Sequence, residues 1–326
     1  MMNSARARSF LAGLLWTLSG AAFAADAFPT RALTLVVPYS EGGSSDTRAR
    51  QVARHMSTHL GQPVQVVNHA GDGGNKGTDL IAKARPDGYT FGLGNLAPMT
   101  VNRHLNPALP FNPKTDLRAI GMIERGPLVL MVSADADFAT AQAMLDKAKN
   151  GTGRLRYASA GVGGSFHLAV ELLEQQVGFT AQHVPFDGGG KATEALFQKK
   201  VDFKFDGVPS AVALLSETPP KVRALAVASR RRSPVLPGVP TFRELGIDGM
   251  EVSNWLGLVA PSGTPDVVIE RLNQALLFSL SQSDVGSTIT RNGNELGAGP
   301  PMYFDAFMSA ESYRWGRLIR EKKISP

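Results

Sequence analysis

The stretch Leu33–Asp46, LTLVVPYSEGGSSD, decides the architecture of this chain. Leu33–Val37 is apolar without a long interruption, which is typical of a strand buried on both faces, and Pro38 ends it. A glycine loop follows, and beyond it apolar residues recur at helical spacing, namely Ala49, Val52, Ala53, Met56 and Leu60. A strand, a glycine loop and a helix in this order predict an α/β fold.

The same order returns twice further along the chain. Leu155–Ala158 precedes a glycine loop at 161–165, and Gln182–Pro185 precedes another at 188–190. Each loop is followed by a helical pattern, so we expect mainly parallel sheets. The other strands expected are Val64–Val67, Tyr89–Leu93, Val201–Phe205 and Val222–Ala228, with helices at 75–84, 265–281 and 301–321. The last two helices are expected to pack on the first lobe.

The N-terminus reads as a signal peptide. Arg6 and Arg8 precede the short apolar run Phe10–Leu18, and Ala22–Ala24 has the form of a cleavage site. We expect cleavage after Ala24 and export to the periplasm, with no membrane insertion afterwards, because the apolar run is shorter than the roughly 20 residues a spanning helix needs. The chain has no cysteine, which excludes disulfides and thiolate chemistry.

The length of 326 residues favours two lobes over a single core. Ile120–Ile123 and Leu128–Val132 are expected to cross from the first lobe to the second, and Trp255–Val259 to return. The division expected is a signal peptide at 1–24, lobe 1 at 25–125 plus 252–326, and lobe 2 at 126–251. The net charge of +6 is spread along the chain, and the basic run at 230–232 is interpreted as a solvated turn, so no nucleic-acid partner is expected.

The three glycine loops point to anion binding. The first turn of a helix leaves backbone N–H groups without partners, and the peptide dipoles add partial positive charge there. Glycine lets a ligand approach this backbone closely, so a carboxylate is a suitable guest. Valine at Gly43 or Gly163 is therefore expected to abolish binding without unfolding the protein. Asp46, in the first helical turn, is interpreted as stabilising the start of its helix.

Six segments resemble the periplasmic receptors of tripartite tricarboxylate transporters, the Bug family. They appear in the family's order over essentially the whole mature chain. They are VVPYSEGGSSD (36–46), GDGGNKGTDLIAKARPDGYTF (71–91), RYASAGVGGSFHLAVELL (156–173), HVPFDGGGKAT (183–193), RSPVLPGVPTFRELG (232–246) and GLVAPSGTP (257–265).

This resemblance implies a type II periplasmic-binding-protein fold, in which two α/β lobes joined by two crossing strands close on one ligand. It also implies a small organic acid or an acidic or aromatic carboxylate as ligand, no cofactor, no metal, a monomeric receptor that is not an enzyme, and the membrane subunits of a secondary transporter as partner. The pocket positions carried over from the family are Tyr39, Ser40, Glu41, Gly42, Gly43, Ser44, Asn95, Leu96, Ala97, Pro98, Ser159, Gly161, Gly163, Ser165, His167, Phe186, Asp187, Gly188, Asp206 and Pro209.

Two of these positions depart from the family pattern. Glu41 and Asp187 stand where uncharged or basic residues are usual. Two like charges about 4 Å apart at an effective dielectric of about 20 repel by about 4 kcal/mol. Either these side chains point to solvent, or the ligand carries a cationic or hydrogen-donating group beside its carboxylate.

Three other functions can be compared with the sequence: an exported hydrolase, a nucleotide-binding protein and a sensory receptor. An exported hydrolase would need a nucleophile with a base, yet the G-x-S-x-G elbow is absent. His55 and His59 stand at helical spacing, but Met56 breaks the H-E-x-x-H signature, and they are interpreted as surface residues. The loop around Gly163 lacks the spacing of a dinucleotide-binding fingerprint. A sensory receptor that docks on a signalling kinase stays open, because its liganded form would look the same in sequence.

Overall fold

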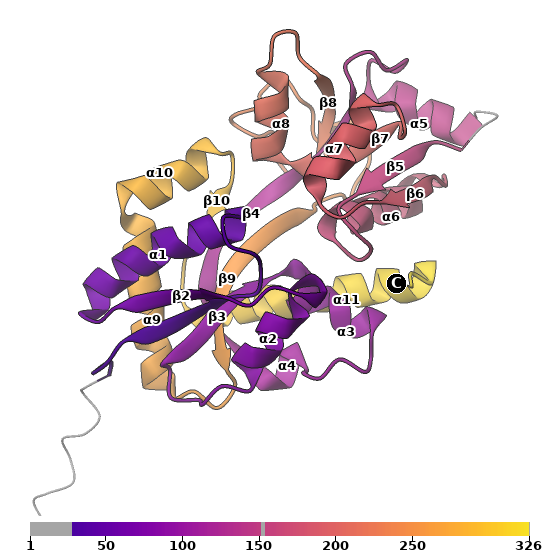
Figure 1. The fold of residues 1–326 in the computed structure, drawn as a ribbon. Helices are drawn as coiled ribbons and strands as arrows, with labels where there is room; N and C mark the ends of the chain where they lie inside the picture. Colours follow the sequence, from indigo (N-terminus) through magenta and orange to yellow (C-terminus); the bar gives the residue numbers. More distant parts are fainter. Residues whose placement is uncertain (1–27, 151–153, 326) are drawn as a thin grey trace, which may run out of the picture.

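The computed structural model describes residues 28–150 and 154–325, and the predicted signal peptide with its cleavage site lies outside these residues. Figure 1 shows two α/β lobes joined by two long strands. These strands are β4 (Leu117–Ser133) and β9 (Ser253–Pro261), which pair with each other in antiparallel register. They are the crossing strands expected from the sequence.

Lobe 1 is built on the strand order β2-β1-β3-β9-β4. The strand β1 (Leu33–Val37) pairs in parallel with β2 (Val64–Asn68) and with β3 (Thr90–Asn95). One face of this sheet is covered by two helices, α1 (Ser44–Leu60) and α9 (Asp266–Ser281), which also contact each other. The apolar face predicted for α1 is buried there, so the periodicity of the sequence found this helix correctly.

Lobe 2 repeats the design with shorter strands. Its strands are β5 (Arg156–Ser159), β6 (Gln182–Pro185), β7 (Phe203–Gly207) and β8 (Val222–Val227). Its helices are α5 (Ala141–Asn150), α6 (Ser165–Val177), α7 (Gly189–Phe197) and α8 (Val208–Leu215). The strands β6 and β7 flank β5 in parallel, while β7 and β8 pair antiparallel with β4.

The sheets are mixed, which corrects the expectation that they are mainly parallel. The strand β4 pairs antiparallel with β7, β8, β9 and the short β10 (Glu295–Leu296). The cause is the connection between the lobes: β4 leaves lobe 1 and β9 returns to it, so the two crossing strands run in opposite directions. Local patterns found the parallel β-loop-α units but do not carry this long-range pairing.

The last helix, α11 (Pro301–Lys322), belongs to both lobes. It packs on β4 in lobe 1 and also contacts α6 in lobe 2, where Lys322 Nζ lies 2.8 Å from Glu174 Oε2. The expectation that it packs on lobe 1 alone is therefore incomplete. No helix in the described ranges combines the length and the apolar character needed to cross a membrane.

Several short elements were not expected from the sequence. Besides α5 and α8 they include α10 (Ser283–Arg291) and the single turns η1 (Asp72–Gly74), η2 (Ala97–Val101), α3 (Asn102–Leu105), α4 (Pro113–Asp116) and η3 (Arg243–Leu245). The remaining helix, α2 (Asn75–Ala82), ends two residues before its predicted end.

Candidate functional site

Four helices begin at a glycine that cannot cap them. The N-cap residues of α1, α6, α7 and α8 are Gly43, Gly164, Gly188 and Gly207, and no side chain caps any of these helices. A serine, threonine or aspartate in this place would fill a first-turn amide with its own oxygen, whereas glycine leaves that amide to a ligand or to water. The three predicted glycine loops, before α1, α6 and α7, thus present open helix N-termini, and α8 adds a fourth that the sequence analysis did not predict.

The first glycine loop is fixed from behind by Asp46. Its carboxylate accepts hydrogen bonds from the Gly42 amide at 2.9 Å, from Arg50 Nε at 3.0 Å and from Asn68 Nδ2 at 3.0 Å. The hydrogen bond from Arg50 lowers the pKa of Asp46 below its ordinary value. Asp46 therefore holds the loop and the start of α1, which is the role the sequence assigned to it.

The side chain of Glu41 is 77% exposed and pairs with Arg50 Nη2 at 3.0 Å. The side chain of Asp187, in the third loop, is 96% exposed and lies 3.4 Å from Lys191 Nζ. Both predicted pocket acids thus point to solvent and to a basic neighbour. The remaining first-loop residues, Ser40 and Gly42 to Ser44, are exposed.

The ends of β1 and β3 are tied together by the Tyr39 hydroxyl, which donates to Asn95 Oδ1 at 2.6 Å. Burial raises the pKa of this hydroxyl above its ordinary value, so it acts as a neutral donor. Leu96 and Pro98 are buried and Ala97 is partly buried at the start of η2. The predicted pocket positions of lobe 1 therefore form one continuous edge of the sheet.

Two amides of the second glycine loop are already bound within the protein. The Gly161 amide donates to Ser159 Oγ at 3.2 Å, and the Gly163 amide donates to His167 Nδ1 at 3.0 Å. Ser159 and His167 thus shape the loop. The amides left for a ligand belong to the first turn of α6, at Ser165 and Phe166, because α6 has no side-chain cap.

The pair formed by Ser159 and His183 has the appearance of a nucleophile with its base. Ser159 Oγ lies 2.7 Å from His183 Nε2, but Ser159 is completely buried. The His183 ring in turn stacks on His167 at 4.1 Å and on Tyr157 at 4.7 Å. This arrangement builds the floor of the second loop, and a substrate cannot reach the serine hydroxyl.

The third loop is held close to the second. The Phe186 amide donates to the Ser159 carbonyl at 3.0 Å, and the Gly188 amide donates to the Phe186 carbonyl at 2.9 Å. Phe186 and Gly188 are partly buried. The loop therefore continues the edge of lobe 2 that begins at Ser159.

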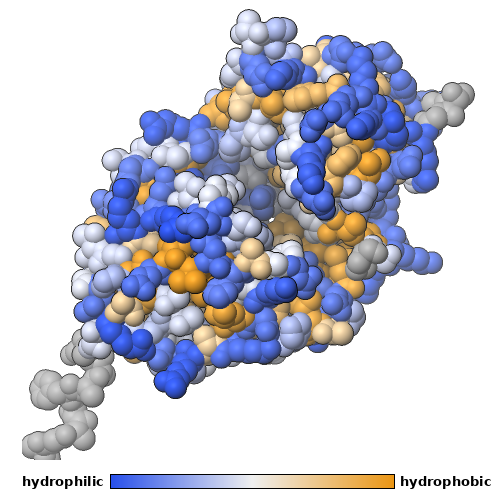
Figure 2. All heavy atoms as spheres, viewed as in Figure 1, coloured by the Kyte–Doolittle hydropathy of each residue, from blue (hydrophilic) through white to orange (hydrophobic). Residues whose placement is uncertain are grey.

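A hollow of about 330 Å³ lies between the lobes. Figure 2 shows the surface hollowed between the lobes. First-turn residues of three helices line this hollow, namely Ser44 of α1, Phe166 of α6 and Pro209 of α8. Three of the predicted pocket residues, Ser44, Asp206 and Pro209, line this hollow directly. The other predicted residues lie in the loops and strand ends just described and are not among the residues that line this hollow.

Sequence reasoning missed most of the wall that lobe 1 and the crossing strands contribute, and several lining residues of lobe 2. The missed lining residues are Arg48, Glu124, Gly126, Pro127, Phe166, Gly207, Ser210, Asn254, Trp255, Leu256, Asn292 and Asn294. Arg48 stands four residues after Ser44 and so faces the same side of α1, a signal that was available in the sequence. The asparagines come from segments distant in the chain, and no local pattern marks them.

The charged side chains among the described lining residues are Arg48, Glu124 and Asp206, and each has a partner. Arg48 Nε donates to Glu124 Oε1 at 2.7 Å and Arg48 Nη2 to Glu124 Oε2 at 3.3 Å. Asp206 Oδ2 accepts from Lys204 Nζ at 2.8 Å, and Lys204 is completely buried. The formal charges around the hollow therefore cancel in pairs, and the helix N-termini supply the remaining positive potential.

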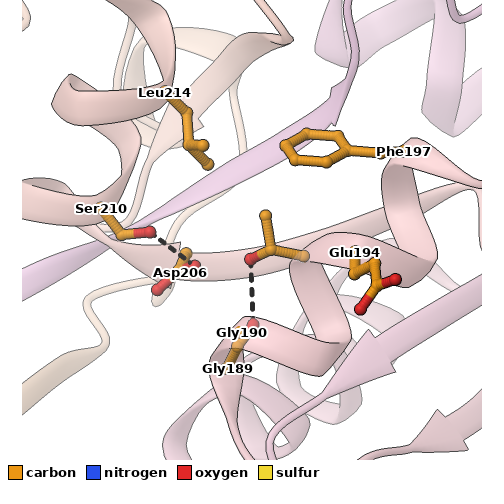
Figure 3. Close-up of a pocket in the computed structure, with 8 residues that line it drawn as sticks. Gly189, Gly190, Glu194, Phe197, Asp206, Ser210 and Leu214 are labelled. Carbon is orange, nitrogen blue, oxygen red and sulfur yellow. Dashed lines mark hydrogen bonds between the residues drawn. The ribbon is translucent and has the colours of Figure 1, made fainter.

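A second hollow, of about 510 Å³, lies within lobe 2 between α7 and α8. In Figure 3 Phe197 and Leu214 face each other across it, and the Ser210 hydroxyl donates to Asp206 at 2.9 Å. Asp206 and Ser210 line both hollows. Only the hollow between the lobes would change shape when the lobes move, so it suits capture of a solute better.

The two glycines at which valine is expected to block binding, Gly43 and Gly163, differ in backbone conformation. At Gly43 the backbone is extended, with φ −74° and ψ 169°, which any residue adopts. Gly163 has φ +76°, and a Cβ there would collide with the Leu105 side chain of lobe 1. Valine at Gly163 would thus strain the loop itself, and only Gly43 offers a clean test.

The two histidines at helical spacing in α1, His55 and His59, each contact a side chain of the C-terminal helices. His55 Nε2 lies 3.0 Å from Asp284 Oδ2, and the His59 ring lies 5.0 Å from the ring of Phe278. Burial lowers the pKa of His59. In the described part of the chain no group of three acidic or imidazole side chains could hold a metal ion.

Two lobes joined by a pair of crossing strands, with open helix N-termini around the hollow between them, define a solute-binding protein of the periplasmic type. The sequence comparison agrees: the model of the tripartite tricarboxylate transporter family receptor matches residues 48–324. The chain belongs to this receptor family, which confirms the resemblance drawn from the six motifs and, with it, the type II binding-protein fold.

Relatives cover nearly the whole chain. A protein of Pseudomonas sp. (strain P51), described as a UPF0065 protein in the tcbD-tcbE intergenic region, is 38% identical over 98% of this chain and 95% of its own. The structure of MatC from Rhodopseudomonas palustris with bound malate is 33% identical, with a TM-score of 0.77 over 90% of this chain and 100% of its own. Another R. palustris structure, with adipate, is 31% identical, with a TM-score of 0.80 over 92% of this chain and 99% of its own.

Proposed function

We propose that this protein captures a small carboxylate-bearing solute in the periplasm and delivers it to the membrane subunits of a tripartite tricarboxylate-type transporter. The observation that carries the proposal is the set of three uncapped helix N-termini, of α1, α6 and α8, around one hollow. The malate and adipate bound by two similar proteins support a carboxylate as the ligand.

The proposed mechanism follows from the geometry of the two edges. One carboxylate oxygen accepts N–H bonds from the first turn of α1 in lobe 1, and the other from the first turn of α6 in lobe 2. Hydrogen bonds to a charged group contribute about 1.5–3 kcal/mol each. Because the two helices belong to different lobes, a bound carboxylate stabilises the closed arrangement, which the transporter then recognises. Bridging waters can complete the contacts.

The proposal also covers the domain boundaries, the oligomeric state, the export and the absence of catalysis. We place lobe 1 at 25–125 plus 252–326 and lobe 2 at 126–251, with β4 and β9 as the hinge. The protein acts as a monomer, and export depends on cleavage after Ala24. Its role is binding without catalysis, which its membership of a receptor family supports.

The test is to give α1 a cap of its own with Gly43→Asp. The extended backbone at Gly43 suits an N-cap aspartate, whose carboxylate would occupy the first-turn amides in place of the ligand. A thermal-shift screen of the mature protein against mono- and dicarboxylic acids, hydroxy acids, amino acids and aromatic acids first finds the compound that binds best. Calorimetry with that compound is expected to show a loss of affinity of about tenfold or more in Gly43→Asp.

Gly238→Asp is the matched control, because Gly238 is exposed and a Cβ there meets no atom within 4 Å. It adds the same charge and should bind normally. Both variants should unfold close to the wild-type temperature. Normal affinity in Gly43→Asp, or a screen in which no carboxylate binds, would reject the proposed function.

A further inference from the structure

The wall of the hollow that α1 and β4 form contains a buried ion pair, Arg48–Glu124. Arg48 is 7% exposed and Glu124 is 6% exposed, yet both line the hollow. Arg48 comes from the second turn of α1 and Glu124 from the crossing strand β4, so the pair joins the ligand-binding helix to the hinge. A buried pair of this kind is a weak source of stability, and its position in the hollow makes recognition the better explanation for it.

The contacts of the pair leave Arg48 with little free charge. Its Nε and Nη2 donate to the two oxygens of Glu124, and its Nη1 donates to Gln51 Oε1 at 2.6 Å. Glu124 Oε2 also accepts from Asn294 Nδ2 at 2.9 Å. The guanidinium is thus already engaged by a carboxylate of the protein, and the wall presents acceptor oxygens and amide groups.

The distance along α1 relates this wall to the carboxylate site. Ser44 and Arg48 are one turn apart on the same face, which is a rise of about 6 Å. A solute whose carboxylate sits at the first turn of α1 therefore reaches the Arg48–Glu124 pair with a group only a few atoms away. On the opposite side its other neighbour is Asp206, whose charge is balanced by the buried Lys204.

We infer that the solute carries one carboxylate and, at its other end, a hydrogen-bond-donating group without negative charge: an amine, an amide or a hydroxyl. This inference rests on the proposed function and specifies its ligand class. A second carboxylate at that end would lie beside Glu124 with no cation free to neutralise it. A donor group finds the oxygens of Glu124 and the side-chain carbonyls of Asn292 and Asn294, which line the same wall. The pair Arg48–Glu124 therefore determines specificity against dicarboxylates.

The inference is tested with compounds of equal length that differ only in the terminal group. Adipate, 6-aminohexanoate, 6-hydroxyhexanoate and hexanoate form one series, and succinate, 4-aminobutanoate, 4-hydroxybutanoate and butanoate a shorter one. For the wild-type protein we expect the amino or hydroxy compound of a series to bind about tenfold or more tightly than the dicarboxylate, because the second carboxylate would lose its hydration beside an ion pair that has no cation free to compensate it.

Variants of the pair should reorder the series. Glu124→Gln frees the guanidinium of Arg48, so the dicarboxylate is expected to gain about tenfold or more and the amino compound to weaken. The double variant Arg48→Gln with Glu124→Gln restores a neutral wall and should return the wild-type order. Arg125→Gln is the control: Arg125 follows Glu124 in the sequence but forms a surface ion pair with Glu295, so its loss should leave the order of affinities unchanged.

The outcomes separate this inference from the proposed function. If a dicarboxylate is the tightest ligand of the wild-type protein, or if Glu124→Gln leaves the order as it was while the protein stays folded by circular dichroism, the inference is wrong and the proposed function stands. If the double variant, folded, keeps the altered order of the single variant, the neutral pair is not what sets specificity. If no compound of either series or of the wider screen binds, the proposed function itself fails.

Discussion

His183 is half-buried between the rings of Tyr157 and His167 and the hydroxyl of Ser159, and this environment governs its protonation. Burial, reinforced by the neighbouring His167, lowers the pKa of His183 to about 4 from the model-peptide value of 6.5. Between these two values the unfolded chain binds a proton that the folded protein does not bind. The free energy of unfolding therefore rises with pH from about 4 to 6.5, and this contribution is fully present above pH 6.5.

We predict that His183→Gln flattens the pH dependence of stability in this window. The glutamine amide can still meet Ser159 Oγ, but it does not titrate. Chemical denaturation of the mature protein at intervals from pH 4 to 7 gives the slope for both proteins. Parallel slopes for wild type and variant would show that another group, for example the Glu171 carboxylate in the same cluster, causes the acid sensitivity.

At the residue scale, the sequence predicted the role of a side chain where that role depends on residues nearby in the chain. Asp46 caps the loop four residues before it, and an acid in a first helical turn predicts this. The direction of the Asp187 side chain was left open by the sequence, and the structure resolves it: Asp187 points to solvent and pairs with Lys191, four residues later. The partner of Arg48 is 76 residues away, and no rule of helical spacing could find Glu124.

At the element scale, α11 joins the two lobes through a small polar cluster. Lys322 Nζ lies 2.8 Å from Glu174 Oε2 and 3.6 Å from Glu171 Oε2, both on α6. Glu174 also accepts a hydrogen bond from the Ala181 amide at 2.7 Å, which holds the end of α6 in place. The C-terminal turn of α11 thus fixes the helix whose first turn is proposed to bind the ligand.

Replacing Lys322 by methionine is expected to lower the free energy of unfolding by about 1–3 kcal/mol, because it leaves the buried Glu174 carboxylate without its cation. Urea denaturation measures the change. Lys323→Met is the matched control, since Lys323 is exposed on the next position and its loss should change stability by less than about 0.5 kcal/mol. Equal effects of the two substitutions would contradict this account of the cluster.

The elements themselves were predictable where one face is periodic or one run is apolar, as for α1, β1 and α9. The short helices α5, α8 and α10 were not predicted because each buries three residues or fewer, which is too few to show a helical repeat of apolar residues in the sequence. The antiparallel pairing of β4 was beyond the sequence for a different reason. This pairing depends on where the chain returns to lobe 1 after building the whole of lobe 2, and no local propensity of the sequence encodes that point.

At the scale of the whole molecule, the loop after α10 touches both lobes at the hinge. A Cβ at Gly293 would meet the side chains of Val208 and Val235 in lobe 2, while a Cβ at Gly126 on the crossing strand β4 would collide with the side chain of Asn294. Asn292 and Asn294 also line the hollow. A change in the angle between the lobes must therefore rearrange the wall that is proposed to read the far end of the solute.

Ligand binding is accordingly expected to close the lobes, and small-angle scattering of the mature protein can measure it. The radius of gyration should fall when the best-binding compound of the screen is added to saturation, because the first turns of α1 and α6 approach one carboxylate from opposite lobes. Gly43→Asp should show no such fall at the same concentration, since its α1 amides are occupied by its own side chain. A wild-type protein that binds the compound by calorimetry without contracting would place the carboxylate on one lobe alone, and the proposed division of its oxygens between α1 and α6 would be wrong.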